Sequence, residues 1–202
     1  MTYWRPSLAA GLLVIFTLVA VPGFGQEKEP FLVGRLLVAA PQMGDPRFAK
    51  TVIYMVSHNP SGAFGLIINR AFGAGPMKEF IKGFDIDASA VEGDIRLHYG
   101  GPVSPAVGFV LHTADYKGPD TQVVNDQMAM TTEKSVLQAI AEGRGPRGSL
   151  VAFGYAGWGA GQLEGEIAKG DWFSIPAEEK LIFDADLKTK WSRASAKVRV
   201  KL

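Results

Sequence analysis

Three histidines are the side chains of this 202-residue chain that could bind a metal or transfer a proton. His58, His98 and His112 each fall at the end of a predicted strand. Strand ends that gather at one edge of a sheet could form a polar site or a metal site. None of the three has a second ligand two or four residues further along the chain. Hydrogen bonding at a strand end is therefore the favoured role for each, and we expect no metal and no other cofactor.

The segment SHNPSGAFGLIINR (57–70) has two glycines, a pattern found both in phosphate loops and in tight hairpins. A phosphate loop needs G-x-x-x-x-G-K-[ST] between a strand and a helix, so that backbone amides and the helix dipole meet the phosphate. Here no lysine follows Gly65, and the β-branched run that comes next is typical of a strand. We predict that Pro60, Ser61 and Gly62 turn a hairpin.

A second glycine cluster, GYAGWGAGQLEGE (154–166), lies between a predicted strand and a predicted helix. A dinucleotide motif would have a third glycine three residues after Gly159, but that position is Gln162. We therefore predict a helix packed closely on its strand. Two carboxylate pairs, Asp85 with Asp87 and Glu164 with Glu166, have no partner that the sequence assigns, and we expect both to be solvated.

Two classes of catalysis lack support in the composition and motifs. The chain has no cysteine, which excludes disulfides, thiolate catalysis and cysteine-ligated zinc. No G-x-S-x-G sequence occurs, so hydrolysis by a Ser/His/Asp triad has no support.

The candidate polar residues must be positioned by short apolar runs that are rich in β-branched and aromatic residues. Gly/Pro turns divide these runs. Strands are predicted within 31–41, 51–59, 64–70, 95–113 (two strands joined by a Gly-Gly-Pro turn), 149–158 and 171–177, and helices within 76–84, 131–143 and the second half of 159–170. We expect a threonine cap at the start of the second helix and Gly143 at its end. The pattern predicts an α+β fold: one compact domain with a mixed, curved sheet flanked by helices.

The first residues resemble a secretory signal peptide over 1–25. Arg5 is followed by an apolar run from Leu8 to Val21, and small residues precede Gln26. An uncleaved N-terminal anchor and a mis-assigned start codon, with the protein beginning near Phe31, are the alternatives. The first reading places the mature protein in the periplasm or outside the cell, the second at the membrane and the third in the cytoplasm.

The formal net charge of the chain after residue 26 is zero, which predicts no overall attraction to nucleic acid or anionic lipid. Removing residues 1–26 takes one of the 21 basic residues, so the remaining 20 equal the 20 acidic residues. The exception is a basic C-terminal tail, predicted over 192–202; the sequence from Lys188 to the end has six Lys/Arg and no acid. It could touch an anionic membrane or nucleic acid, but we favour an edge strand at 197–202 whose charges discourage aggregation.

Five sequence blocks resemble the bacterial YqgE/AlgH family, in order, over residues 31–191. They are LVAAPQMGDPRFAKTVIYMVSHNPSGAFGLIINR, GGPVSPAVGFVLHT, MTTEKSVLQAI, LVAFGYAGWGAGQLEGEI and DWFSIPA. The resemblance implies a compact α+β domain over 31–191. The family is largely uncharacterised, is named for a proposed role in transcriptional control of alginate production, and offers no established catalytic residues.

Polar residues within these blocks come from four separated segments, and we predict that they line a shared surface cleft. They are His58, Asn59, Asn69, His112, Thr113, Thr131, Thr132, Tyr155, Trp158, Gln162 and Glu164.

The chain departs from the family pattern in three places. About 30 residues precede the first block, Val107 stands where an arginine is usual, and a basic sequence after Trp191 replaces the usual helix and tail. An exported protein meets neither chromosomal DNA nor nucleoside triphosphates, so a cytoplasmic regulatory role would not transfer to it.

Two functional hypotheses remain. The first is a non-enzymatic binding or regulatory protein whose polar cleft holds a small ligand or a protein partner. The second is an enzyme of unidentified reaction that uses the cleft histidines and threonines. A histidine with a perturbed pKa inside a deep pocket would favour the second. Nucleic acid is not expected as a partner of an exported chain, and membrane contact is expected only through an uncleaved N-terminus.

Overall fold

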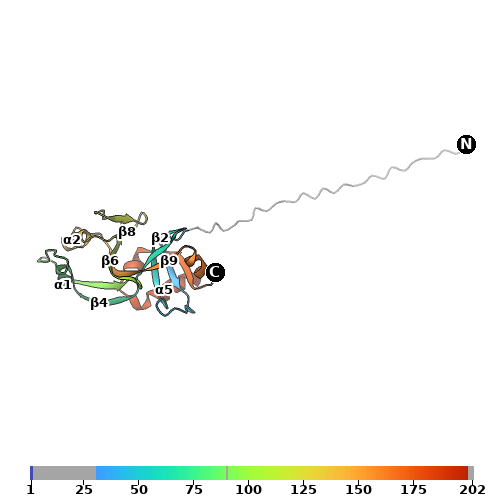
Figure 1. The fold of residues 1–202 in the computed structure, drawn as a ribbon, viewed down its shortest axis with the longest axis horizontal. Coiled ribbons are helices and arrows are strands. Elements are labelled where there is room, and N and C mark those ends of the chain that lie inside the picture. Colours follow the sequence, from blue (N-terminus) through green and yellow to red (C-terminus); the bar gives the residue numbers. More distant parts are fainter. Residues whose placement is uncertain (2–30, 90, 200–202) are drawn as a thin grey trace.

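The fold is a curled, mixed sheet with five helices, in a computed structural model that describes residues 1, 31–89 and 91–199 (Figure 1). The strands are β1 (Arg35–Ala39), β2 (Val52–Asn59), β3 (Gly62–Ile67), β4 (Ala71–Pro76), β5 (Asp94–Tyr99), β6 (Val103–Thr113), β7 (Thr121–Val123), β8 (Met128–Thr131), β9 (Ser149–Gly159) and β10 (Trp172–Pro176). The helices are α1 (Met77–Lys82), α2 (Ser135–Ala141), α3 (Gln162–Ala168), α4 (Glu179–Phe183) and α5 (Leu187–Arg199). The predicted α+β architecture is confirmed.

The ten strands form one sheet in the order β10-β1-β2-β3-β9-β6-β8-β7, with β5 also paired to β9 and β4 paired to β5. The β5–β9 pair is parallel and the other described pairs are antiparallel. Figure 1 shows α1 and α2 at one end of the sheet and α5 at the other.

Strand β2 explains how the sheet holds apolar side chains on both faces. Its residues 52–56 are all buried, as the apolar run predicted. Because side chains alternate along a strand, Tyr54 packs into one core cluster with Leu36, whereas Ile53 packs into another with Leu37. Helices α4 and α5 complete the first cluster, and α3 completes the second.

The Gly-Gly-Pro segment after β5 is a crossing of two backbones. Gly100 donates its N–H to Phe153 O at 2.8 Å and accepts from Ile67 N at 2.9 Å. Beside it β9 turns through Gly154, which has φ +70°. A Cβ on Gly101, at φ +154°, would lie 2.1 Å from the carbonyl carbon of Tyr155. Only glycine fits there.

Strands β5 and β6 were predicted as consecutive strands around this turn, yet they do not pair with each other. Val151 of β9 faces Leu97 of β5 on one edge and Val110 of β6 on the other. Strand β9 therefore lies between the two, and its insertion produces the mixed character of the sheet.

The second predicted helix starts later than expected. Lys134 occupies the N-cap position of α2 and no side chain caps it, so the predicted threonine cap is wrong. Thr131 instead ends strand β8. The predicted stop is confirmed, since Gly143 has φ +70° and Arg144 N donates to Ala139 O at 2.8 Å.

The basic C-terminal sequence is helical up to Arg199, so the edge-strand interpretation is wrong for its described residues. Helix α5 runs through residue 192, where the tail was predicted to begin. Ala194 is fully buried, and Trp191 donates Nε1–H to Ala39 O at 2.9 Å, so the helix is anchored on β1.

Within the described residues, none of the helices is long and apolar enough to cross a membrane. The predicted signal peptide and the alternative anchor fall on residues 2–30, outside the described part.

Candidate functional site

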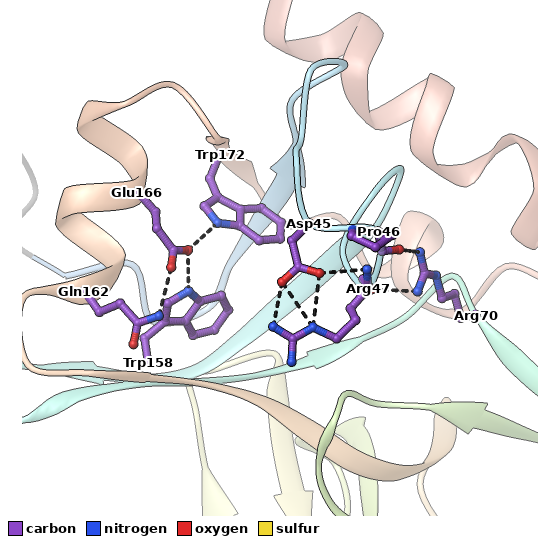
Figure 2. A network of polar contacts seen from close by, with 8 residues as sticks. All are labelled: Asp45, Pro46, Arg47, Arg70, Trp158, Gln162, Glu166 and Trp172. Carbon is purple, nitrogen blue, oxygen red and sulfur yellow. Dashed lines mark hydrogen bonds and ion pairs between the residues drawn. The ribbon is translucent and has the colours of Figure 1, made fainter.

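The loop between β1 and β2 is held in place by the residues that follow β3. Asp45 accepts from Arg47 N at 2.9 Å, which closes a tight turn, and pairs with the Arg47 guanidinium at 2.7 Å. Arg70 donates to Arg47 O at 2.6 Å and to Ala49 O at 2.8 Å, as Figure 2 shows in part. Asn69 accepts from Val52 N at 2.8 Å. Asn69, one of the predicted cleft residues, is therefore used to fix this loop.

A carboxylate on α3 joins two indoles from separate strands. Glu166 Oε2 accepts from Trp158 Nε1 and from Trp172 Nε1, each at 2.8 Å, and Oε1 accepts from Gln162 Nε2 at 2.9 Å (Figure 2). Phe48 from the loop packs on both indole rings, with centroids 6.5 and 5.7 Å away. Glu166 was expected to be a solvated carboxylate, and that expectation is wrong because α3 packs directly over β9.

His58 is buried beside the same helix. Its Nδ1 accepts from Leu32 N at 3.0 Å, so the ring proton lies on Nε2, which donates to Glu164 Oε1 at 3.0 Å. Hydrogen bonds from its own backbone amide and from His58 lower the pKa of Glu164. Glu164 is exposed, as expected of a solvated carboxylate, but it has a partner that the sequence did not assign, His58. Both ring nitrogens of His58 are engaged, as the hydrogen-bonding interpretation predicted.

A groove opens where the β2–β3 hairpin meets β9, and we call it the hairpin groove. It has a volume of about 460 Å³ and is lined by Ser57, Asn59, Ser61, Gly62, Ala63, Phe64, Val103, Tyr155, Gly157 and Trp158. The Phe64 and Tyr155 rings lie 4.7 Å apart at its apolar side. The predicted turn is confirmed: Asn59 pairs with Gly62 in the β2–β3 ladder, so Pro60 and Ser61 form the turn at one end of the groove.

A second polar group, far from this groove, surrounds His112. His112 Nδ1 donates to Thr113 O at 2.8 Å, so Nε2 accepts from the Thr131 hydroxyl at 2.9 Å. Thr131 in turn lies 2.9 Å from the Thr121 hydroxyl, and Thr113 donates to Asp115. Burial lowers the pKa of His112. A hydroxyl bound to an imidazole is the arrangement used in nucleophilic catalysis, but His112 and Thr131 are both 0% exposed.

His98 lies in a third place, on the wall of a pocket of about 220 Å³ between β5, β9 and α4. Its Nδ1 is 3.3 Å from Val151 O, and burial lowers its pKa to about 4. Behind this pocket Lys190 is fully buried and donates to Ile182 O at 2.7 Å. Burial lowers the pKa of Lys190 to about 8, against the opposing effect of Asp184.

The shifted pKa of His98 makes stability depend on pH. Between pH 6.5, its ordinary pKa, and about 4, the unfolded chain binds a proton that the folded chain does not. The free energy of unfolding should therefore fall by on the order of 3 kcal/mol as pH falls through this window. We expect His98→Gln to be less sensitive, with a smaller fall in the free energy of urea unfolding between pH 7 and 4.5. Parallel pH curves for the two proteins would contradict this assignment.

The predicted cleft residues do not lie around one cleft. Asn59, Tyr155 and Trp158 line the hairpin groove, and His58, Gln162 and Glu164 lie beneath the neighbouring helix α3 or on it. The group at His112 includes Thr113 and Thr131, while Asn69 holds the β1–β2 loop and Thr132 is exposed.

Distance along β9 separates the two main groups. Ser149 of β9 faces His112, and Trp158 of β9 faces Ala63, which faces His58. Nine residues of strand correspond to about 30 Å along the chain. His58 therefore stands apart from His112, while His98 lies on the other side of β9 from His112, in its own pocket. The described residues contain no cluster of three or more metal-ligating side chains.

Six residues that build these sites were not among the predicted cleft residues. Phe48, Arg70, Glu166 and Trp172 build the region under α3, and Phe64 and Val103 line the hairpin groove. Glu166 was considered only as a solvated carboxylate. Four of the six are apolar or aromatic, and a search for polar residues overlooked those four. All six lie inside the five blocks that resemble the family, and this was the signal in the sequence that could have identified them.

A curled mixed sheet with helices on both faces defines a compact α+β domain, and the hairpin groove has no charged side chain in its lining. The sequence model of the AlgH-like family matches residues 36–202, so the chain belongs to that family. This confirms the resemblance seen in the five blocks.

Individual relatives agree with this assignment. A UPF0301 protein of Rhodospirillum rubrum is 42% identical over 180 residues, covering 89% of this chain and 94% of that protein. One from Methylococcus capsulatus is 48% identical over 161 residues, with coverage of 80% and 88%. The solution structure of the AlgH protein from Pseudomonas aeruginosa has a TM-score of 0.69 at 38% identity, covering 88% of this chain and 93% of that one.

Proposed function

We propose that this chain is a non-enzymatic binding protein whose hairpin groove holds an uncharged small ligand or an uncharged segment of a protein partner. The observation that carries the proposal is the chemistry of the lining: it contains aromatic rings, hydroxyls and an amide, but no carboxylate, ammonium, guanidinium or imidazole. Sites for phosphates and other anions normally present cationic side chains or helix N-termini. An uncharged ligand fits this lining better.

Free hydrogen-bonding groups in the groove support binding. The hydroxyls of Ser57, Ser61 and Tyr155 make no hydrogen bond with other described residues. Asn59 uses Oδ1 to accept from Ser61 N at 2.8 Å, which leaves its amide N–H groups available. A few convergent polar groups beside aromatic rings are typical of small-molecule sites, and the volume of about 460 Å³ lies in their usual range.

The enzyme alternative is favoured by one observation, the lowered pKa of His98 inside a pocket. Two others weigh against it. An imidazole with a pKa of about 4 is a weak general base at neutral pH. The His112–Thr131 pair has suitable geometry but is fully buried, so a substrate cannot reach the hydroxyl.

A titration followed by backbone amide NMR tests the binding proposal. The probes are benzamide and inositol, which are uncharged, benzamidine, a cation matched to benzamide in shape, and phenyl phosphate, an anion. We expect millimolar, saturable shifts with an uncharged probe at residues 57–64 and 155–158, and weaker shifts there with the charged probes. Shifts confined to the His98 pocket, or a preference for phenyl phosphate, would contradict the proposal.

A further inference from the structure

A second groove lies between α5 and the strands β1 and β10, and we call it the α5 groove. It has a volume of about 430 Å³, and its walls include Ala39, Phe173, Trp191, Ala196 and Val198. These side chains are apolar, in contrast with the mixed lining of the hairpin groove. Because Trp191 donates Nε1–H to Ala39 O at 2.9 Å, the indole is fixed as one wall.

The groove also contains a hydroxyl that the protein leaves unused. Ser195 is one of the lining residues, and its buried Oγ has no hydrogen-bond partner among the described residues. A buried polar atom without a partner carries an energetic cost, which a ligand or an ordered water would relieve.

Two cations without carboxylate partners in the described part of the chain lie near this apolar groove. Lys50 is exposed, and its Nζ is 6.0 Å from the centroid of the Trp191 ring. Lys188 is exposed one helical turn before Ser192, which also lines the groove. By contrast, Arg193 pairs with Asp184 at 2.6 Å and Lys197 with Glu178 at 2.7 Å.

We propose that the α5 groove binds the alkyl chain of a long-chain carboxylate, with the carboxylate paired to Lys50 at the Trp191 end. The apolar walls suit the chain, since burying it removes apolar surface from water. The positive charge selects an anionic head over a neutral one. The occupant is a single amphiphile, because the apolar side chains of α5 form one wall of a groove against β1 and β10, while Lys190 and Ala194 of the same helix are buried against the domain.

Methyl NMR with dodecanoate, kept below its micelle concentration, tests the proposal. We expect saturable shifts of the Ala39, Ala196 and Val198 methyl groups. Ala196→Phe places a ring in the groove from an exposed helix position and should weaken binding at least tenfold. Lys50→Gln should weaken dodecanoate binding about fivefold and leave dodecanol binding unchanged, since an exposed ion pair contributes about 1 kcal/mol. Lys169→Gln, at an exposed lysine that follows α3, is the matched control and should bind as the wild type does.

Three results would overturn the proposal. One is the absence of saturable shifts in folded wild-type protein, and another is unchanged dodecanoate binding by folded Ala196→Phe. The third is sedimentation with phosphatidylglycerol vesicles that Ala196→Phe does not reduce, which would indicate a membrane surface. Because the hairpin groove involves different residues, failure here leaves the benzamide titration unaffected.

Discussion

Gly101→Ala should leave little or no folded protein, with a loss of more than 4 kcal/mol in the free energy of unfolding. A Cβ at this position would lie 2.1 Å from the Tyr155 carbonyl carbon and 2.2 Å from its oxygen, and both atoms belong to the backbone of β9. Side chains cannot move aside to relieve that contact, and φ +154° is itself unfavourable for alanine. Urea unfolding followed by circular dichroism measures the effect.

Gly165→Ala is the matched control for this substitution. Gly165 lies on the exposed side of α3 with no atom within 4 Å of an added Cβ. Alanine there should be neutral or stabilise the protein by up to about 1 kcal/mol, since it favours helix. A Gly101→Ala protein within about 1 kcal/mol of the wild type would show that the backbone crossing is not as close as described.

Glu166→Ala should lower the free energy of unfolding by on the order of 3 kcal/mol, the second largest effect that we expect from a substitution. The change leaves the indole N–H groups of Trp158 and Trp172 without an acceptor, and both side chains are buried. Glu166→Gln keeps a carbonyl oxygen that can accept from both indoles, so it should cost only about 1 kcal/mol. Urea unfolding gives the values, and indole fluorescence reports the changed surroundings.

Glu133→Ala is the control for the loss of a surface carboxylate, because Glu133 is exposed and its side chain makes no hydrogen bond or ion pair with other described residues. It should change stability by less than about 0.5 kcal/mol. If Glu166→Ala behaved like this control, Glu166 would not be the link between the two indoles.

Local sequence patterns predicted the elements whose determinants are local. The apolar run 51–59 gave a buried strand, and Pro60 with Ser61 gave the hairpin turn. The prediction of a C-terminal edge strand was wrong for the described residues, because charged and apolar residues alternate in KVRVKL as they do in a strand. On α5, however, Ala194 is buried and Trp191 is held by its hydrogen bond to Ala39 O. Such tertiary contacts override local propensity.

Long-range pairing was beyond the sequence reasoning. The position of β9 between β5 and β6 depends on the close backbone crossing at Gly101. A glycine in the sequence does not show which other strand will pack against it. The partner of His58 is Glu164, 106 residues away. Both residues were selected from the blocks, but the pair could be recognised only once α3 was placed beside β2.

Some of the candidate residues make hydrogen bonds that hold α3 and a loop in place, and others line the hairpin groove. His58, Glu166 and Asn69 spend their hydrogen bonds on packing α3 and the β1–β2 loop. The hairpin groove beside them keeps its hydroxyls free. The binding proposal draws on this arrangement, since a preorganised site avoids the cost of ordering its side chains.

The most direct test of the binding account is the affinity of benzamide for four proteins, measured by NMR titration. Wild type and Thr132→Ala, a substitution at an exposed residue outside the groove, should bind equally. Tyr155→Ala should weaken binding about tenfold through loss of an aromatic contact, and Val103→Trp should do the same by filling the groove without removing a core ring. Unchanged binding by folded Val103→Trp and Tyr155→Ala would contradict the account.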